Sequence, residues 1–488
     1  MFTPKLNRRL SPEDTAFLTL ETPEAPNNIG SIAVFEGEIA FEKFLDNIAR
    51  RIHLVPRYMQ VVVPAPLNIS RPTWEFAPDF RIERHIQRVR IEAPGTDEQL
   101  ADLAGRLFSG MLDRSKPLWE MFFVEGMEGR TAVISKIHHC LVDGVGGVEL
   151  MMAMLDVSPE PPSFPPPSRY DPPPMPTSSS LLVDAVFDWL SETVDRMAMW
   201  QRRLVDLDSE RDDGWLHALT RALEVAFPYF TQPVLKAPFN GPMRGDRRLA
   251  LSSYPFEEVR AMRGNYGATI NDVVLAVLGG AMARYLREKG EPTEGRQLRV
   301  VVPVNVRRED ERGTLGNRIS MLLVEIPMSG VSALERLRLI KERMERLKRD
   351  NIAEGVETVA DLLLGVPMPF LAGFAGLGAP ANWVANMLCT NVPGPMIPLY
   401  TVGHRLLHHY AIAPLVWEMG LGCAVTSYNH RLYFTLQGDG PTGNDVDRLS
   451  DLLRESYVEL RRATIGGALP AEEEVPTVVP ARRKIAAA

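Results

Sequence analysis

Cysteine is scarce in this sequence, and so is net positive charge. The 488 residues include three cysteines, Cys140, Cys389 and Cys423, which lie far apart and without C-x-x-C spacing. They offer neither a disulfide framework nor a zinc motif, and they predict a reducing compartment such as the cytoplasm. The formal net charge is -8. Because phosphate binding requires a basic surface, this charge argues against nucleic acid as a partner.

Long uninterrupted apolar runs are also missing. The N-terminal stretch MFTPKLNRRLSPEDTAFLTLE has basic residues but no apolar run after them, so we expect no secretory signal. Residues Leu362–Gly403 contain no charged residue, but prolines and glycines interrupt them before a membrane-spanning helix could form. Two interpretations stay open for this segment: core helices with a buried strand, or a surface that meets lipid or lines an acyl tunnel.

The chain length predicts two domains, because 488 residues exceed what one hydrophobic core usually serves. Ten prolines between Val157 and Ser180 favour an extended linker, or else a docking site for a proline-recognising domain. We therefore expect an N-terminal domain (1–156), a proline-rich linker with a helical crossover (157–240) and a C-terminal domain (241–469). A disordered tail is expected over 470–488.

Hydrophobic periodicity predicts mixed α/β structure in both halves. In the first half we expect strands over 29–37 and 131–137 and helices over 40–52 and 97–112. In the second half the expected strands cover 296–307, 320–328, 408–417 and 422–439, and a long helix covers 332–351. The last strand pair should turn at Asn429-His430. The basic residues of the long helix either bind the phosphates of coenzyme A or an anionic membrane surface, or they form a solvated face.

The stretch ISKIHHCLVDGVGG places two histidines, His138 and His139, at the end of a predicted strand. Histidine exchanges a proton near neutral pH, so this pair is a candidate acid/base site. Asp143 can hold the following loop, and Gly144 begins a glycine turn into a helix. A metal site is the alternative, although the i, i+4 spacing of helical zinc histidines is absent; two structural histidines are another. A second pair, His408-His409, has no Asp-Gly after it.

Several motifs occur in a fixed order along the chain. HHCLVDG matches the H-H-x-x-x-D-G motif of the superfamily of chloramphenicol acetyltransferase, peptide-synthetase condensation domains and bacterial wax ester synthase/diacylglycerol acyltransferases. SKPLWEMFFVEG, FNGP, NDVVLA, LGNRIS and TNVPGP also occur. From about Leu10 to Arg462 the sequence resembles the wax ester synthase/diacylglycerol acyltransferase family.

That resemblance implies an α/β fold of two chloramphenicol-acetyltransferase-like domains with the active site in a channel between them. It implies transfer of a fatty acyl group from acyl-CoA to a diacylglycerol or a long-chain alcohol, without an acyl-enzyme. Acyl-CoA is then a substrate, and no cofactor or metal is expected. Peripheral contact with the inner membrane face or with lipid droplets would follow. The alternatives are a condensation-type or polyketide-associated acyltransferase that uses a carrier-protein thioester, and a non-catalytic lipid-binding relative.

The resemblance also implies roles for individual residues. His139 is the expected general base, with an ordinary imidazole pKa and an acid limb of activity near pH 6 to 7. His138 is expected to pack and brace the turn. Asn271 is a candidate oxyanion donor, with helix N-capping as its alternative.

The same resemblance assigns supporting residues. Asp143 is expected to pair with Arg57, with Arg307 as a rival for that ion pair. Glu21 is either a residue near the channel or a solvated charge at a helix end. The PLW element, Pro117, Leu118 and Trp119, is expected near the substrate channel.

Overall fold

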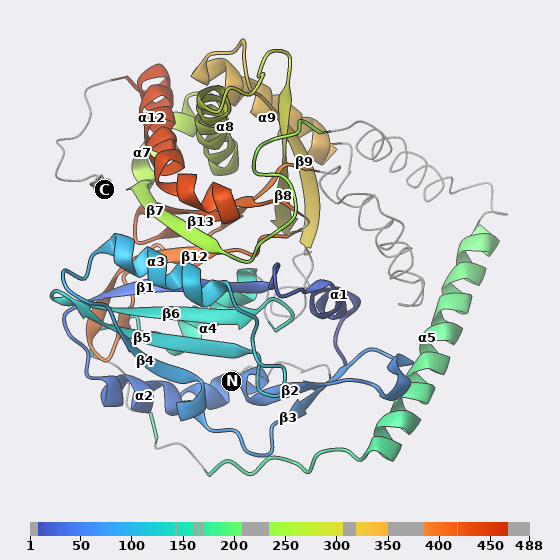
Figure 1. The fold of residues 1–488 in the computed structure, drawn as a ribbon. Helices are drawn as coiled ribbons and strands as arrows, with labels where there is room; N and C mark the ends of the chain where they lie inside the picture. The colour runs from blue at the N-terminus through green and yellow to red at the C-terminus, as the bar shows by residue number, and fades with distance from the viewer. Residues whose placement is uncertain are drawn as a thin grey trace, which may run out of the picture.

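The computed structural model describes residues 8–141, 144–160, 164–165, 169–206, 234–305, 319–349, 385–416 and 418–466. Two six-stranded sheets form the two halves of the molecule, each with its own hydrophobic core, and helix α3 (Asp97–Phe108) lies where they meet (Figure 1). Mixed α/β structure with two sheet-rich halves is therefore confirmed.

The first sheet has the order β11-β12-β1-β6-β5-β4. Its centre is β1 (Asn28–Glu36) antiparallel to β6 (Arg130–His138), with β5 (Trp119–Met127) antiparallel to β6 and β4 (Ile86–Arg90) parallel to β5. Both β1 and β6 were predicted, because their apolar residues suit a strand with a buried face. The helices of this half are α1 (Pro12–Leu20), α2 (Phe41–Ala49), α3 and α4 (Gly144–Met154), and a small hairpin joins β2 (Gln60–Val63) to β3 (Thr73–Phe76).

Two strands from late in the chain complete this first sheet. The strands β11 (Tyr400–Thr401) and β12 (His404–Ile412) come from the predicted C-terminal domain, yet β12 pairs antiparallel with β1. The pairing with β12 covers an edge of β1 that would otherwise present unpaired backbone N–H and C=O groups. The sheets therefore do not follow the division of the chain that the sequence predicted.

The second sheet has the order β7-β14-β13-β10-β8-β9. Its strands are β7 (Arg247–Pro255), β8 (Gln297–Asn305), β9 (Ile319–Pro327), β10 (Met387–Val392), β13 (Leu421–Tyr428) and β14 (Arg431–Asp439). The predicted hairpin turn is confirmed, since Asn429 and His430 both have positive φ, at 42° and 62°. The helices here are α7 (Phe256–Gly264), α8 (Ile270–Glu288), α9 (Ala333–Arg349) and α12 (Val446–Thr464).

Described parts of the proline-rich linker are anchored to the first half. The Arg51 guanidinium lies 4.5 Å from the Phe164 ring centroid, and the Tyr170 hydroxyl donates to the Ala77 carbonyl at 2.8 Å. Beyond the linker runs the long helix α5 (Ser178–Asp206), so helix is confirmed over these residues, while the predicted crossover between the halves stays a prediction because residues 207–233 lie outside the described ones. Two aromatic side chains of the linker, Phe164 and Tyr170, thus contact the first half of the molecule.

Part of the uncharged segment Leu362–Gly403 is described. The start of β10 is buried in the second sheet, which confirms the expected buried strand. The rest of that segment before residue 385, and the tail predicted over 470–488, lie outside the described residues. Among the helices that the structure describes, none combines the length and the apolar character needed to cross a bilayer.

An ion pair withdrawn from solvent joins α2, α4 and β11. Arg51 binds both carboxylate oxygens of Asp156 at 2.7 and 2.8 Å and donates to the Met154 carbonyl, and both side chains are almost fully buried. The Asp156 backbone in turn exchanges two hydrogen bonds with Tyr400. Burying either charge without the other would destabilise the fold, because an unpaired buried charge loses its hydration. The pair therefore holds the segment after α2, the end of α4 and β11 together.

We predict that Asp156→Asn lowers the free energy of unfolding by about 3 to 5 kcal/mol, since it leaves the Arg51 charge buried without its counterion. The control is Asp46→Asn, which breaks the exposed i, i+4 pair with the neighbouring residue Arg50 and should leave stability unchanged. Urea unfolding of both variants makes the comparison. Equal losses in the two variants would contradict the structural role of the buried pair.

Candidate active site

The two histidines of the motif lie at the end of β6, where two different neighbours hold their backbone. The His138 amide donates to the Leu118 carbonyl at 2.9 Å, on the β5 side. The His139 amide donates to the Asn27 carbonyl at 2.9 Å, on the β1 side. Successive side chains of a strand point to opposite faces, so the two imidazoles enter different surroundings.

His139 is partly exposed and stacks on Phe17 of α1, with ring centroids 4.0 Å apart and an interplanar angle of 13°. Its Nδ1 is buried and has no hydrogen-bond partner among the described residues. Burial, with a smaller contribution from His138, lowers the pKa of His139 to about 4. This pKa is lower than the ordinary imidazole value expected from the sequence, because the packed surroundings disfavour the charged ring. The imidazole is neutral at pH 7 and available as a proton acceptor.

His138 is fully buried and holds the turn that follows β6. Its Nδ1 accepts a hydrogen bond from the Cys140 amide at 3.1 Å, and its Nε2 lies 3.4 Å from Glu21 Oε1. Because Nδ1 is an acceptor, the proton of the neutral ring sits on Nε2 and points toward the carboxylate. These contacts are those of a brace for the turn.

Glu21 follows the last residue of α1, and its side chain is 1% exposed. The expected alternative, a solvated charge at a helix end, is therefore wrong. Arg114 donates to Oε2 at 2.8 Å, and the Asn27 amide donates to Oε1 at 3.1 Å. Burial raises the pKa of Glu21, but the hydrogen bonds from His138 and Arg114 outweigh it, so the pKa is below its usual value. The carboxylate is charged at neutral pH.

Asn27 connects this carboxylate to the catalytic candidate. Its amide binds Glu21, its side chain donates to the Phe17 carbonyl at 2.7 Å, and its carbonyl accepts from His139. Arg114 reaches the same helix by donating to the Leu18 carbonyl at 2.7 Å. The end of α1 is thus tied to both histidines.

A further buried cation comes from the second half of the molecule. Arg247, at the start of β7, is 1% exposed and donates from Nη2 to the Pro26 carbonyl at 2.9 Å. Its amide binds the Ser109 hydroxyl at 3.0 Å. Burial lowers the pKa of Arg247 to about 10 and also lowers that of Lys136, a buried residue of β6. Arg247 joins the two halves next to the loop that carries Glu21.

Sequence analysis missed Phe17, Asn27, Arg114 and Arg247. None of them lies within a motif that indicates a type of chemistry. Each contacts the site through a residue that is distant in the sequence. The position of Asn27 directly before a predicted strand that pairs with the histidine strand was the one available signal.

The PLW element lies in the core beside β6. Trp119 is fully buried, stacks on His85 with ring centroids 4.6 Å apart, and donates from Nε1 to the Tyr58 carbonyl at 2.8 Å. Pro117 and Leu118 are also buried. The Leu118 carbonyl supports His138, so the element positions the motif from behind. A place at the substrate channel stays a prediction.

Asn271 is the second residue of α8, in the second half. The helix is capped by Thr269, whose side chain accepts from the Asp272 amide while Asp272 binds the Thr269 amide, so the alternative that Asn271 is the N-cap is wrong. The Asn271 Oδ1 is buried without a hydrogen-bond partner among the described residues. Its role as an oxyanion donor stays a prediction.

The predicted ion pair of Asp143 also stays a prediction, since Asp143 and Arg307 lie outside the described residues. Arg57 donates to Gln60 at 2.8 Å and stacks over Trp74, and burial lowers its pKa to about 10. Gly144 is the first residue of α4, so the helix begins where a glycine turn was predicted.

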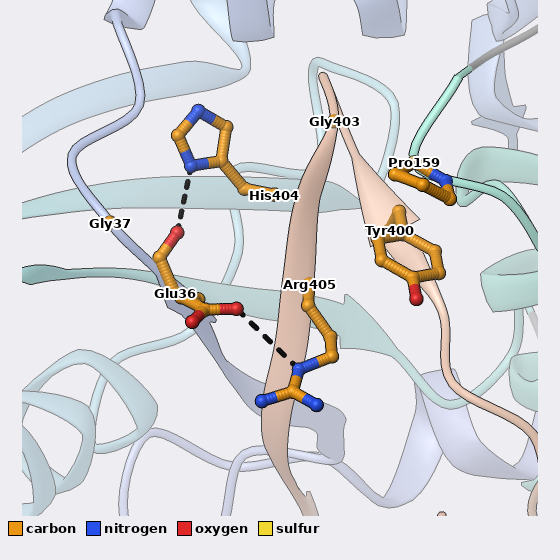
Figure 2. A pocket seen from close by; sticks show the side chains of 7 residues that line it. All are labelled: Glu36, Gly37, Pro159, Tyr400, Gly403, His404 and Arg405. Carbon is orange, nitrogen blue, oxygen red and sulfur yellow. Dashed lines mark hydrogen bonds and ion pairs between the residues drawn. The ribbon is translucent and has the colours of Figure 1, made fainter.

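An open cavity of about 550 Å³ lies at the opposite end of β1, lined by Glu36, His404, Arg405 and their neighbours (Figure 2). There the His404 Nδ1 lies 2.7 Å from the Glu36 carbonyl. The pairing of Asn28 with His138 puts the histidines roughly 27 Å away along the strand. This cavity is therefore separate from the candidate site. The described residues contain no cluster of His, Cys, Asp and Glu suited to a metal ion.

Basic residues of α9 make local contacts. Lys341 binds the Tyr266 carbonyl at 3.1 Å and lies 3.6 Å from Glu345, and Arg343 donates to the Glu325 carbonyl. Arg336 is buried, and that burial lowers its pKa. These contacts favour a structural and solvated face over an anion site.

The sequence matches two known domain families. The wax ester synthase/diacylglycerol acyltransferase catalytic domain matches residues 10–274, and the WS/DGAT C-terminal domain matches residues 315–461. The chain belongs to the wax ester synthase/diacylglycerol acyltransferase family. The predicted resemblance is thereby confirmed over most of the chain.

Curated relatives and solved structures agree with this family. A probable diacylglycerol O-acyltransferase of Mycobacterium tuberculosis is 28% identical over 438 residues, 88% of this chain and 90% of the relative. A putative one from the same species is 31% identical over 93% of this chain and 96% of its own. Among solved structures, the Marinobacter aquaeolei wax ester synthase/diacylglycerol acyltransferase aligns with a TM-score of 0.66 at 24% identity, covering 93% of this chain and 99% of that one. A condensation domain of the calcium-dependent antibiotic synthetase aligns at 0.62 and 17% identity, over 95% of this chain and all of that one, which shows a shared fold.

The depressed pKa of His139 makes a kinetic prediction. A base must be unprotonated to accept a proton, so kcat/KM should stay level from about pH 8 down to about pH 5 and fall toward its pKa of about 4. Initial rates across this range test it, with near-ultraviolet circular dichroism recorded at each pH to establish that the fold is intact. An acid limb centred near pH 6.5 would show that the ring is not desolvated as described.

Proposed function

We propose that this protein is an O-acyltransferase that moves a fatty acyl group from acyl-CoA to the hydroxyl of diacylglycerol or a long-chain alcohol. The products are triacylglycerol or wax ester. The observation that carries this proposal is the His139 imidazole, stacked on Phe17 and held by its backbone at the end of β6, in a chain of this family. The names of the mycobacterial relatives favour diacylglycerol as the acceptor.

The proposed chemistry needs one base. An alcohol is far too weak an acid to be ionised outright by imidazole, so the proton moves to His139 as the oxygen attacks the thioester carbon. A carbon–oxygen bond forms, and the resulting tetrahedral oxyanion then expels the thiolate as the carbon–sulfur bond breaks. The imidazolium returns its proton to the thiolate, which leaves as free coenzyme A. No acyl-enzyme, cofactor or metal takes part.

Two further residues have proposed roles at the reacting groups and the motif loop. The Asn271 amide is the candidate hydrogen-bond donor to the oxyanion, a contact whose removal usually costs about 10²- to 10³-fold in kcat. Asn271 is free for such a role in one respect, because Thr269 and not Asn271 caps α8. Asp143 is proposed to hold the loop after the histidines through an ion pair with Arg57.

His138 and Glu21 act as positioning residues in this proposal. The contact of Nε2 with Glu21 and the bond from Cys140 to Nδ1 fix the His138 ring in one tautomer. The ring then holds the turn that carries His139. Peripheral contact with a membrane or a lipid droplet is part of the same proposal, because both the acceptor and the product are insoluble lipids.

The activity itself is tested with purified protein and palmitoyl-CoA, offered either dioleoylglycerol or hexadecanol, with products resolved by thin-layer chromatography. Formation of triacylglycerol or wax ester supports the proposal. Hydrolysis alone, or no product with either acceptor, would overturn it.

The two histidines should differ in their contributions. His139→Ala is expected to lower kcat by about 10²- to 10⁴-fold, the usual range for one general base, with little change in acyl-CoA binding. His138→Ala should reduce kcat less and lower the melting temperature, because it removes a brace. His53→Ala, at an exposed histidine, is the control and should match wild type. A dead His138→Ala enzyme beside a fully active His139→Ala enzyme would reverse the assignment.

Glu21→Gln keeps the size of the side chain and removes its charge. We expect a loss of about 1 to 3 kcal/mol in stability, less than for a fully buried pair because Arg114 is 47% exposed. We also expect a lower kcat with the KM for acyl-CoA unchanged, since the altered brace acts on the base. Glu24→Gln, three residues later and exposed, is the matched control. If both variants behave as wild type, Glu21 does not position His138.

A further inference from the structure

Helix α5 stands on the outer flank of the first half (Figure 1), and two of its acidic residues bind arginines from the start of the chain. Asp184 receives a hydrogen bond from Arg8 Nη1 at 2.9 Å, and Asp188 forms an ion pair with Arg9. Ala185, between them, is fully buried. The acidic residues of this turn are thus neutralised against the body of the protein.

The opposite side of α5 carries an uncovered apolar stripe. Residues at i, i+3, i+4, i+7 and i+11 share one face of a helix, and a globular protein normally turns such a face to its core. Here those residues are exposed by 41% to 67%: Val183, Val186, Phe187, Leu190 and Val194. Trp189, at the edge of the stripe, is 49% exposed. The orientation is the reverse of that expected for a helix whose apolar side packs on its own protein.

Two more exposed apolar side chains lie outside α5. Leu67, 86% exposed, belongs to a 3-10 turn (Pro66–Asn68) that contacts α5, and its positive φ of 56° is unusual for leucine. Leu20, 55% exposed, ends α1 directly before Glu21. The same helix α1 carries Phe17, which stacks on His139. An exposed apolar side chain is therefore present on the helix that contacts the candidate base.

We propose that this face, the α5 stripe with Leu67 and Leu20, is the surface with which the protein sits on a lipid layer; the inference rests on the proposed function and names where its lipid contact occurs. Aliphatic side chains with an aromatic residue at the edge suit burial at the boundary of headgroups and acyl chains. An acceptor held in a lipid layer must reach His139 from that layer. Arg8 and Arg9, which bind α5, lie just before α1, the helix whose Phe17 stacks on His139.

Vesicle flotation tests the proposal. The probe is phosphatidylcholine vesicles with dioleoylglycerol, and the variant combines Val183→Glu, Phe187→Glu and Leu190→Glu. Its vesicle-bound fraction should fall at least tenfold, and so should the ratio of its rate on vesicle-borne dioleoylglycerol to its rate on soluble hexanol. The matched control combines Val157→Glu and Ile397→Glu, two apolar residues exposed by 61% and 47% away from the stripe, and should float as wild type does.

Trp189 gives an independent measurement. Vesicles of brominated phosphatidylcholine should quench wild-type tryptophan fluorescence, and Trp189→Phe should lose at least half of that quenching if this residue is the one in contact with lipid. Equal quenching in the two proteins would overturn the assignment of this face.

Each remaining outcome has one meaning. If wild type and the triple variant float equally, the docking face is wrong while the acyltransferase proposal stands. If wild type is active on dioleoylglycerol and does not float, lipid contact itself is wrong. A triple variant that floats normally but loses a dimer seen by light scattering assigns the stripe to a second copy of the chain and overturns the proposal. Absence of acyl transfer to any acceptor overturns the proposed function instead.

Discussion

The buried charge of Glu21 is the constraint on which the candidate site depends. A carboxylate taken out of water must be matched by donors with good geometry, or its desolvation destabilises the fold. Arg114, before β5, and the Asn27 amide, before β1, donate hydrogen bonds to Glu21, and the His138 Nε2 at the end of β6 lies 3.4 Å from it. Meeting its needs therefore fixes the end of α1, the start of β1 and the turn after β6 in one arrangement.

The same burial sets the chemistry of the neighbouring ring. His139 is held by its backbone to Asn27 and by its ring to Phe17, and both contacts depend on α1 being in place. Packing lowers the pKa of His139, so the ring is a weaker base than free imidazole but is present in its neutral form at every physiological pH. A neutral base suits a reaction in which proton transfer accompanies attack. Stability has the matching pH dependence: the unfolded chain binds a proton at His139 between its ordinary pKa and about pH 4, so acid in that window favours unfolding.

Secondary structure, turns and short motifs were predicted from the sequence, because interactions between neighbouring residues determine them. The period of apolar residues located β1, β6 and α9, the Asn429-His430 pair located a hairpin, and the H-x-x-x-D-G stretch located the histidines. The pairing of β12 with β1 was not predicted, because about 370 residues separate the partners and no local pattern encodes the choice. Glu21 was ambiguous for the same reason: an acidic residue after a helix is usually solvated, and only its distant donors make burial possible. Asn271 resembled a cap, but Thr269 and Asp272 already form the capping box.

His139 is a neutral base of lowered pKa beside a braced His138. The most direct measurement is nitrogen NMR of the protein labelled at histidine, followed across a pH titration and assigned with His139→Gln and His138→Gln. We predict that His139 stays neutral at about pH 5.5 and titrates near 4, while the neutral form of His138 is a single tautomer with its proton on Nε2. A His139 resonance that titrates near 6.5, or a His138 ring that exchanges between tautomers, would contradict it.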